Sequence, residues 1–408
     1  MRRKLASPFP HGKSQIPQSG KLRLLEEFRN ERKQEMPISA TYICPIRGLV
    51  GLEPPEPARL GRAAKVAKSL GLDRLLLPVL EEPLLQGTRA KVKYLDGLVK
   101  ALDQVGEAKL NAWLIAPAQR ILGLNFVAPY LVRGVRDSKA GKVFVDGRIR
   151  NLWPFNWWAD PFIFQKRIRL FREVVTAVHG HTALTGWLIL DRALEWARPE
   201  LHVAEIALRS YIAEIRECDE SGTIYMGLGW SELLDPQMPQ ALAAEVDGFK
   251  MSGSESEQLG LKKREDLVGE LLITAYLGTV TQWLFRRPIE VEIGWSLLGE
   301  MRESGEILES ARRLNEQGLE GVSWLSLADP DSPLSTKPPW SLWTRLAYVG
   351  LLDHALDPKE HVECLIDELR LRDSKNRNDD FIDISPDEYV ADPRTQLPRL
   401  WDHFRESI

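Results

Sequence analysis

Carboxylates stand at the ends of two apolar runs in this chain. Asp191 and Glu195 follow the run Trp187–Leu190, and Glu292 lies within the run Ile289–Ile293. Two facing carboxyl groups can divide the work of a hydrolysis, one ionised as nucleophile and one protonated as general acid. Glu292, Asp191 and Glu195 are therefore candidate catalytic residues, provided that the fold brings the ends of the two runs to the same place.

Short apolar runs alternate with longer helical patterns from residue 38 onward. This alternation is typical of repeated strand–helix units around a parallel sheet. Asp191 follows the fourth predicted strand directly, and Glu292 lies near the end of the seventh. The eight predicted strands are Ser39–Cys44, Leu75–Val79, Leu110–Ile115, Leu184–Leu190, Thr223–Leu228, Gly248–Met251, Ile289–Ile293 and Gly321–Leu327.

Between the strands, apolar residues recur every three or four positions, which predicts amphipathic helices. Several of these patterns stop at a glycine, namely Gly71, Gly180 and Gly318, as helices with a C′ glycine do. The predicted helices are Ala58–Ser69, Arg89–Val105, Phe162–Val178, His202–Glu217, Glu265–Phe285 and Glu303–Gln317.

Eight such units close most naturally as an α/β fold of the (β/α)8 barrel type, the TIM barrel. We predict the barrel over residues 38–360, an N-terminal extension over residues 1–37, and a C-terminal helix, polar linker and docking segment over residues 361–408. An open doubly wound sheet is the alternative, but the first strand–helix turn lacks the GxGxxG of its nucleotide-binding form. In a barrel, Asp191, Glu292 and Trp324 should meet at one C-terminal mouth.

From about Ile38 to Lys359, the chain resembles the clan of retaining (β/α)8 glycoside hydrolases that includes cellulases, mannanases and β-galactosidases. Glu292-Ile293-Gly294 is similar to the E-F-G-like motif that carries the clan's strand-seven nucleophile, and Trp324 is similar to its sugar-facing tryptophan on strand eight. The resemblance implies a glycoside or a β-linked oligosaccharide as the ligand and Glu292 as the nucleophile.

The sequence departs from the clan at strand four, where the acid/base glutamate ends a W-x-x-x-N-E-like motif. Counting from Trp187 places Asp191 at the motif's asparagine and Arg192 at its glutamate. An arginine stays protonated far above neutral pH and cannot exchange a proton with a glycosidic oxygen. The usual general acid is therefore missing.

Two carboxylates could replace it. Asp191 lies at the strand tip but is one methylene shorter than a glutamate, and Glu195 lies four residues further on. Each has a structural explanation as well, because Asp191 could pair with Arg192 or a neighbouring strand and Glu195 could be a solvated residue at a helix start.

Glu292 also needs a partner if it lies inside a barrel mouth, and Arg192 is a natural bidentate partner for it. Such a pair would keep the shape of a glycosidase site while blocking the attack of the carboxylate. Two hypotheses stay open: a glycoside hydrolase-like enzyme, and a catalytically inactive barrel that binds a ligand or serves as a scaffold protein.

The third strand–helix connection is long, from residue 116 to residue 160, and loops on this face often contact substrates. It contains a hairpin pattern at Val143–Asp146 and the indoles of Trp157 and Trp158. These rings could stack on a sugar or could anchor the loop to the barrel. The candidate substrate-binding residues are Trp157, Trp158, Trp324, Trp295 and Arg192.

The composition limits the classes of partner. The chain has 408 residues with 54 basic and 58 acidic side chains and a net charge of −4, so it has no basic field for nucleic acid. Its three cysteines form no CxxC pair, and no P-loop or HExxH is present, so we expect neither cofactor nor metal. Without a signal-like or membrane-spanning apolar run, we expect a cytoplasmic protein with no membrane insertion. No feature predicts an oligomeric state.

Overall fold

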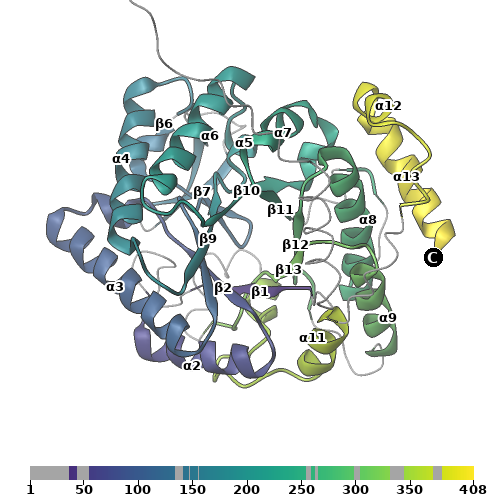
Figure 1. Ribbon diagram of the computed structural model, residues 1–408, viewed down its shortest axis with the longest axis horizontal. Helices are drawn as coiled ribbons and strands as arrows, with labels where there is room; N and C mark the ends of the chain where they lie inside the picture. Colours follow the sequence, from purple (N-terminus) through teal and green to yellow (C-terminus); the bar gives the residue numbers. More distant parts are fainter. Residues whose placement is uncertain are drawn as a thin grey trace, which may run out of the picture. The chain divides into compact units, whose positions relative to one another are not determined.

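Eight parallel strands close into a barrel in the computed structural model, with helices around it (Figure 1). The order around the barrel is β1-β13-β12-β11-β10-β9-β3-β2. All eight predicted strands are present, and the (β/α)8 fold is confirmed. Their bounds are β1 (Ile38–Thr41), β2 (Arg74–Pro78), β3 (Asn111–Ile115), β9 (Leu184–Ile189), β10 (Thr223–Gly229), β11 (Gly248–Ser252), β12 (Ile289–Ile293) and β13 (Gly321–Trp324).

The structure describes residues 36–43, 55–133, 141–146, 148–154, 156–253, 259–261, 265–297, 304–330, 344–370 and 379–408. The predicted N-terminal extension as far as residue 35, and residues 371–378 of the predicted linker, lie outside these ranges.

The helices begin and end close to their predicted positions. Gly71, Gly180 and Gly318 follow α2, α4 and α9 with φ of 89°, 72° and 66°, the left-handed conformation of a C′ glycine. The helix α8 is long and apolar enough to cross a membrane, yet 83% of its apolar stretch is buried inside the protein, as in a core helix. The bounds are α2 (Pro57–Ser69), α3 (Thr88–Glu107), α4 (Pro161–Val178), α5 (Ala193–Trp196), α6 (Leu201–Arg216), α7 (Gln237–Leu242), α8 (Leu267–Phe285) and α9 (Ser304–Asn315).

The segment after residue 360 has two parts with different packing. The helix α11 (Val362–Arg370) packs against α9 and β1, so it takes the place of the barrel's last helix. The helices α12 (Pro386–Ala391) and α13 (Pro393–Ser407) lie beside α8 (Figure 1). The ring of Tyr276 on α8 lies 5.1 Å from Trp401 and 5.6 Å from Phe404 of α13. The predicted docking segment thus lies on α8.

The long third connection forms a sheet of its own, in the order β4-β5-β7-β8-β6. The predicted hairpin at Val143–Asp146 is its antiparallel pair β7–β8. The other strands were not predicted, because pieces of two or three residues leave no readable alternation. The strands are β4 (Arg120–Ile121), β5 (Leu124–Phe126), β6 (Val132–Arg133), β7 (Gly141–Val145) and β8 (Arg148–Pro154).

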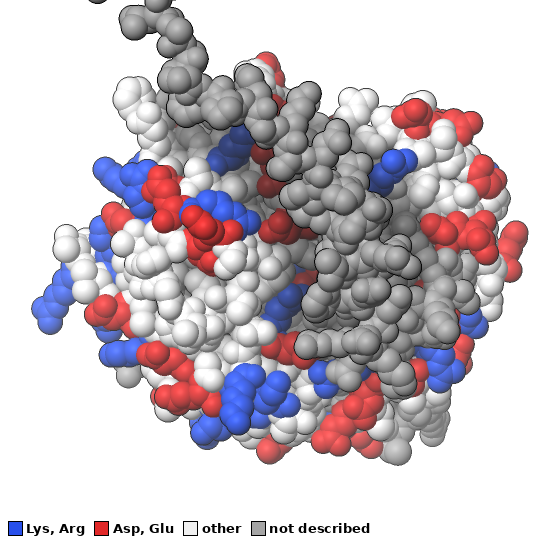
Figure 2. Space-filling model, in the orientation of Figure 1, with Lys and Arg blue, Asp and Glu red and all other residues white. Residues whose placement is uncertain are grey.

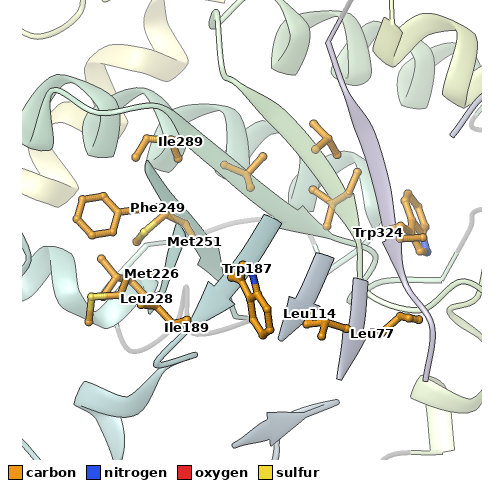
Figure 3. Close-up of a cluster of buried hydrophobic side chains, with 14 of the residues drawn as sticks. Leu77, Leu114, Trp187, Ile189, Met226, Leu228, Phe249, Met251, Ile289 and Trp324 are labelled. Carbon is orange, nitrogen blue, oxygen red and sulfur yellow. The ribbon is translucent and has the colours of Figure 1, made fainter. Parts of the chain in front are cut away.

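Apolar side chains fill two separate layers because neighbouring strand residues point to opposite faces. Leu77 and Ile189 belong to the larger cluster between the strands and the helices, shown in Figure 3. Their neighbours Leu76 and Leu188 belong to a second cluster inside the barrel. The alternation that builds this double core also decides which polar residues face the barrel interior.

Polar side chains close the N-terminal end of the barrel interior. Ser39 donates a hydrogen bond of 2.8 Å to Glu290, and Arg74 forms an ion pair with the same carboxylate. The guanidinium of Arg74 also stacks on Trp113, 4.0 Å from the ring centroid. Because Glu292 lies two residues after Glu290, it faces the same interior one step closer to the C-terminal mouth.

Candidate functional site

The C-terminal ends of the strands enclose a cavity lined by four of the eight predicted site residues, namely Asp191, Arg192, Glu292 and Trp295. Its volume is about 30 Å³, room for about two water molecules. Asp191 and Glu292 both face it, as predicted, and Trp324 also lies at this end of β13. The lining residues are Thr41, Ile43, Pro78, Ile115, Arg120, Ile121, Leu122, Gly123, Asp191, Arg192, Lys250, Ser252, Glu292, Trp295 and Leu325.

Glu292 forms its ion pair with a residue that the sequence did not single out. Oε2 of its carboxylate accepts a hydrogen bond from Nζ of Lys250, and both side chains are buried. Lys250 lies on the adjacent strand β11 and points to the same interior face. Pairing of Glu292 with Arg192 was therefore a wrong expectation, because the neighbouring strand supplies a closer cation.

Arg192 instead contacts Glu195. Its Nε donates to Oε1 of Glu195 at 2.7 Å, and Nη1 of Arg120 lies 2.5 Å from Oε2. Arg192 itself has φ of 52°, a left-handed conformation at the start of the short helix α5. Glu195 is therefore not simply a solvated residue at a helix start, because its carboxylate bridges the guanidinium groups of Arg192 and Arg120.

Asp191 packs against Gly227 on β10, where the lack of a side chain leaves room for it. A Cβ atom added to Gly227 on β10 would lie 2.7 Å from Cα of Asp191, and one on Gly229 would overlap the carboxyl group of Glu195. Asp191 is flanked by Leu190 and Arg192, both at positive φ (50° and 52°). Strained residues of this kind persist where the surroundings fix them, often at functional sites.

The pKa of Asp191 is raised to about 6, because burial disfavours the ionised form. Lys250 opposes this effect, and the negative charge of Glu292 adds to it. The cavity therefore holds two carboxyl groups in different situations: Glu292 in contact with a cation, and Asp191 with a reduced tendency to ionise.

The raised pKa makes a prediction about stability and pH. Folded Asp191 binds a proton up to about pH 6, whereas the unfolded residue releases it near pH 4, so its stabilising contribution is complete at low pH and is lost as the pH rises through 6. The shift corresponds to about 3 kcal/mol. Asp191→Asn, which cannot ionise, should gain stability relative to the wild type by roughly this amount between pH 4 and pH 7 in chemical denaturation. A difference that does not change with pH would contradict the assignment.

Two of the predicted tryptophans lie at the mouth in different environments. Trp295 lines the cavity and is 7% exposed. Trp324 is 1% exposed and belongs to the apolar layer of Figure 3, and its Nε1 donates to the carbonyl of Val349 at 2.6 Å. Of these two indoles, that of Trp295 lines the cavity and that of Trp324 does not.

The indoles of Trp157 and Trp158 are buried, with exposed fractions of 0% and 5%, and stack on each other with centroids 3.8 Å apart. The guanidinium of Arg167 on α4 stacks on Trp157 at 4.0 Å, and its Nε donates to Glu81 at 2.7 Å. Neither indole lines the cavity in the part of the chain that the structure describes. Of the two alternatives, these contacts support the anchor and not the sugar platform.

Glu270, in the first turn of α8, organises the loop that carries Trp295. Its carboxylate accepts hydrogen bonds from three successive backbone amides, those of Gly294, Trp295 and Ser296, at 2.6, 2.9 and 2.7 Å. The loop that follows Glu292 is thereby fixed by a buried side chain of the preceding helix.

Three residues of the site were not predicted: Lys250, Arg120 and Glu270. Lys250 carried a readable signal, because a lone lysine between Phe249 and Met251 must face the side of the strand that these two avoid. Arg120 lies in a two-residue strand, and Glu270 acts through backbone amides, so neither leaves a pattern in the sequence.

Within the described residues, no group of three or more His, Cys, Asp or Glu side chains is arranged to hold a metal ion. His181, near the opposite end of the barrel, contacts Asp103, with Nε2 3.1 Å from Oδ1. The absence of a cofactor stays a prediction.

Solved structures share this fold. No family model matches the sequence, and no curated protein matches it either. GH5_18 from Streptomyces cattleya, solved in complex with GlcNAc, is 14% identical, with a TM-score of 0.63 over 82% of this chain and 80% of that one. An exo-β-1,4-mannosidase from Opitutaceae bacterium strain TAV5 is 16% identical, with a TM-score of 0.63 over 82% and 59%. A β-galactosidase from the psychrophilic Marinomonas ef1 is 10% identical, with a TM-score of 0.54 over 82% and 59%.

Proposed function

We propose that this chain, which has the barrel fold of the glycoside hydrolase clan, binds a glycoside or oligosaccharide at its C-terminal mouth without hydrolysing it by the two-carboxylate route. Support for a sugar ligand comes from the fold and from neighbours solved with GlcNAc and with Manβ1-4GlcNAc. The surface agrees with a ligand other than a polyanion, since basic and acidic side chains are interspersed on the face shown in Figure 2.

One observation carries the proposal: two of the three candidate carboxylates, Glu292 and Glu195, are in contact with cations. Lys250 holds Glu292, while Arg192 and Arg120 take up both oxygens of Glu195. Retaining hydrolysis needs one carboxyl group to deliver a proton to the leaving oxygen and the other to attack the sugar. Both oxygens of Glu195 contact guanidinium groups, so this carboxyl group could deliver a proton only after one of these contacts is broken. Arg192 has no proton to release at neutral pH.

Turnover of 4-nitrophenyl β-glycosides tests the proposal. General acid assistance contributes about 10²–10⁴-fold in hydrolysis, and an aryl leaving group needs less of it, so these substrates are the most permissive. We expect the wild type to release nitrophenol no faster than buffer does, while calorimetry detects binding of Manβ1-4GlcNAc. Turnover that disappears in Glu292→Gln would contradict the proposal.

A second function, retaining hydrolysis with Asp191 as the general acid, is favoured by the raised pKa of this residue. Two carboxyl groups whose environments push their pKa values apart are the usual arrangement of an acid and a nucleophile. This alternative requires turnover that falls as the pH rises above about 6 and that is lost in both Asp191→Asn and Glu292→Gln. The variant Arg192→Glu places a glutamate at the clan's usual acid/base position. Turnover that appears only in this variant would favour the binding function of the wild type, whereas turnover already present in the wild type would favour Asp191 as the acid.

A further inference from the structure

The β4–β5 hairpin reaches from the inserted sheet into the cavity. Ile121, Leu122 and Gly123 at its tip line the same cavity as Asp191 and Glu292. Ile121 and Leu122 are 4% and 2% exposed and pack in the apolar cluster of the barrel interior. Space beside the two carboxyl groups is thus filled by the chain's own side chains.

The backbone of this tip is unfavourable for one of its residues. The two turn residues, Leu122 and Gly123, have φ of 49° and 75°, as a tight two-residue hairpin turn requires. Glycine adopts this conformation readily, whereas leucine rarely does. The turn itself does not favour a leucine at position 122. The side chain of Leu122 fills space in the cavity, and this role explains the residue better.

An ion pair ties the hairpin to the barrel. Arg120, at the base of the tip, contacts Glu195 at 2.5 Å, and Glu195 also holds Arg192 of strand four. The side chains of Arg120 and Glu195 are 24% and 17% exposed, so solvent reaches the contact. Partly exposed ion pairs are weak enough to open.

We propose that the β4–β5 hairpin occludes this site: its tip fills the space that a sugar ring needs, and the Arg120–Glu195 ion pair holds it there. The inference rests on the proposed function. A cavity of about 30 Å³ cannot take a pyranose ring, so a ligand enters only when the hairpin yields. The apparent affinity for the ligand is then lower than the affinity of the open form, because the hairpin is displaced in only a small fraction of the molecules.

The test compares Arg120→Gln, which breaks the ion pair, with Leu122→Gly, which removes the buried tip and suits the turn. Arg150→Gln is the matched control, because Arg150 belongs to the same inserted sheet and pairs only loosely with Asp146, at 3.9 Å. Calorimetry with Manβ1-4GlcNAc gives the dissociation constant, and hydrogen exchange without ligand reports on the amides of residues 120–126. We expect Arg120→Gln and Leu122→Gly to bind several-fold more tightly and to exchange faster, with Arg150→Gln unchanged.

The outcomes separate this inference from the proposed function. If the wild type binds and both hairpin variants have its affinity and exchange rates, the hairpin has no such role and sugar binding stands. If exchange accelerates in both variants but no protein binds the disaccharide or releases nitrophenol, the hairpin contact is confirmed and sugar binding is wrong. Tighter binding in Arg150→Gln as well would also overturn the role of the hairpin.

Discussion

Lys250→Met is expected to lower the free energy of unfolding by about 3–5 kcal/mol at pH 8. Lys250 is 2% exposed and is the ion-pair partner of Glu292, which is 7% exposed. Removing the lysine leaves a buried negative charge beside Asp191, with no cation in contact with it among the described residues. Leaving a buried charge uncompensated costs more than the intact pair contributes.

The loss should come from the charge that is left alone and not from the removal of the lysine as such. The double variant Lys250→Met/Glu292→Gln removes this charge as well, so it should recover much of the loss in urea denaturation at pH 8. Equal midpoints for Lys250→Met and the wild type at pH 8 would show that the pair is not buried as described.

The fold was predictable because hydrophobic periodicity records which face each element buries. The strands Leu75–Val79 and Ile289–Ile293 could be located from their apolar runs, and Gly71, Gly180 and Gly318 marked helix ends through a conformation that glycine adopts easily. Apart from the hairpin at Val143–Asp146, the inserted sheet was not predicted, because strands such as β4, with two residues, have no periodicity to read.

The site was predictable in position but not in its pairing. Asp191 and Glu292 were placed at the mouth by the geometry of parallel strands, which requires only the order of the elements. Which charged residues pair depends on strand register and on the direction of each side chain. Lys250 contacts Glu292 from the adjacent strand. Arg192, with its left-handed backbone, contacts Glu195. Neither fact follows from residue types and spacing alone.

Arg167→Met is expected to cost about 3–5 kcal/mol of unfolding free energy, although the residue lies away from the cavity. Arg167 is fully buried, donates to Glu81 at 2.7 Å and stacks on Trp157. Tyr130 of the inserted segment donates to the same carboxylate at 3.2 Å. The variant therefore leaves the buried charge of Glu81 without its arginine partner. It also weakens the contact between α4 and the segment that carries the hairpin.

A surface ion pair between neighbouring helices supplies the control. Lys91 on α3 lies 2.7 Å from Glu173 on α4, but both side chains are about a third exposed. Lys91→Met should cost at most about 1 kcal/mol, because solvent replaces the lost partner. Arg167→Met/Glu81→Gln should recover part of the loss seen in Arg167→Met, since no buried charge is left alone. Equal thermal midpoints for Arg167→Met and Lys91→Met would mean that the anchor of the inserted segment rests on its apolar contacts, with the buried charge pair contributing little.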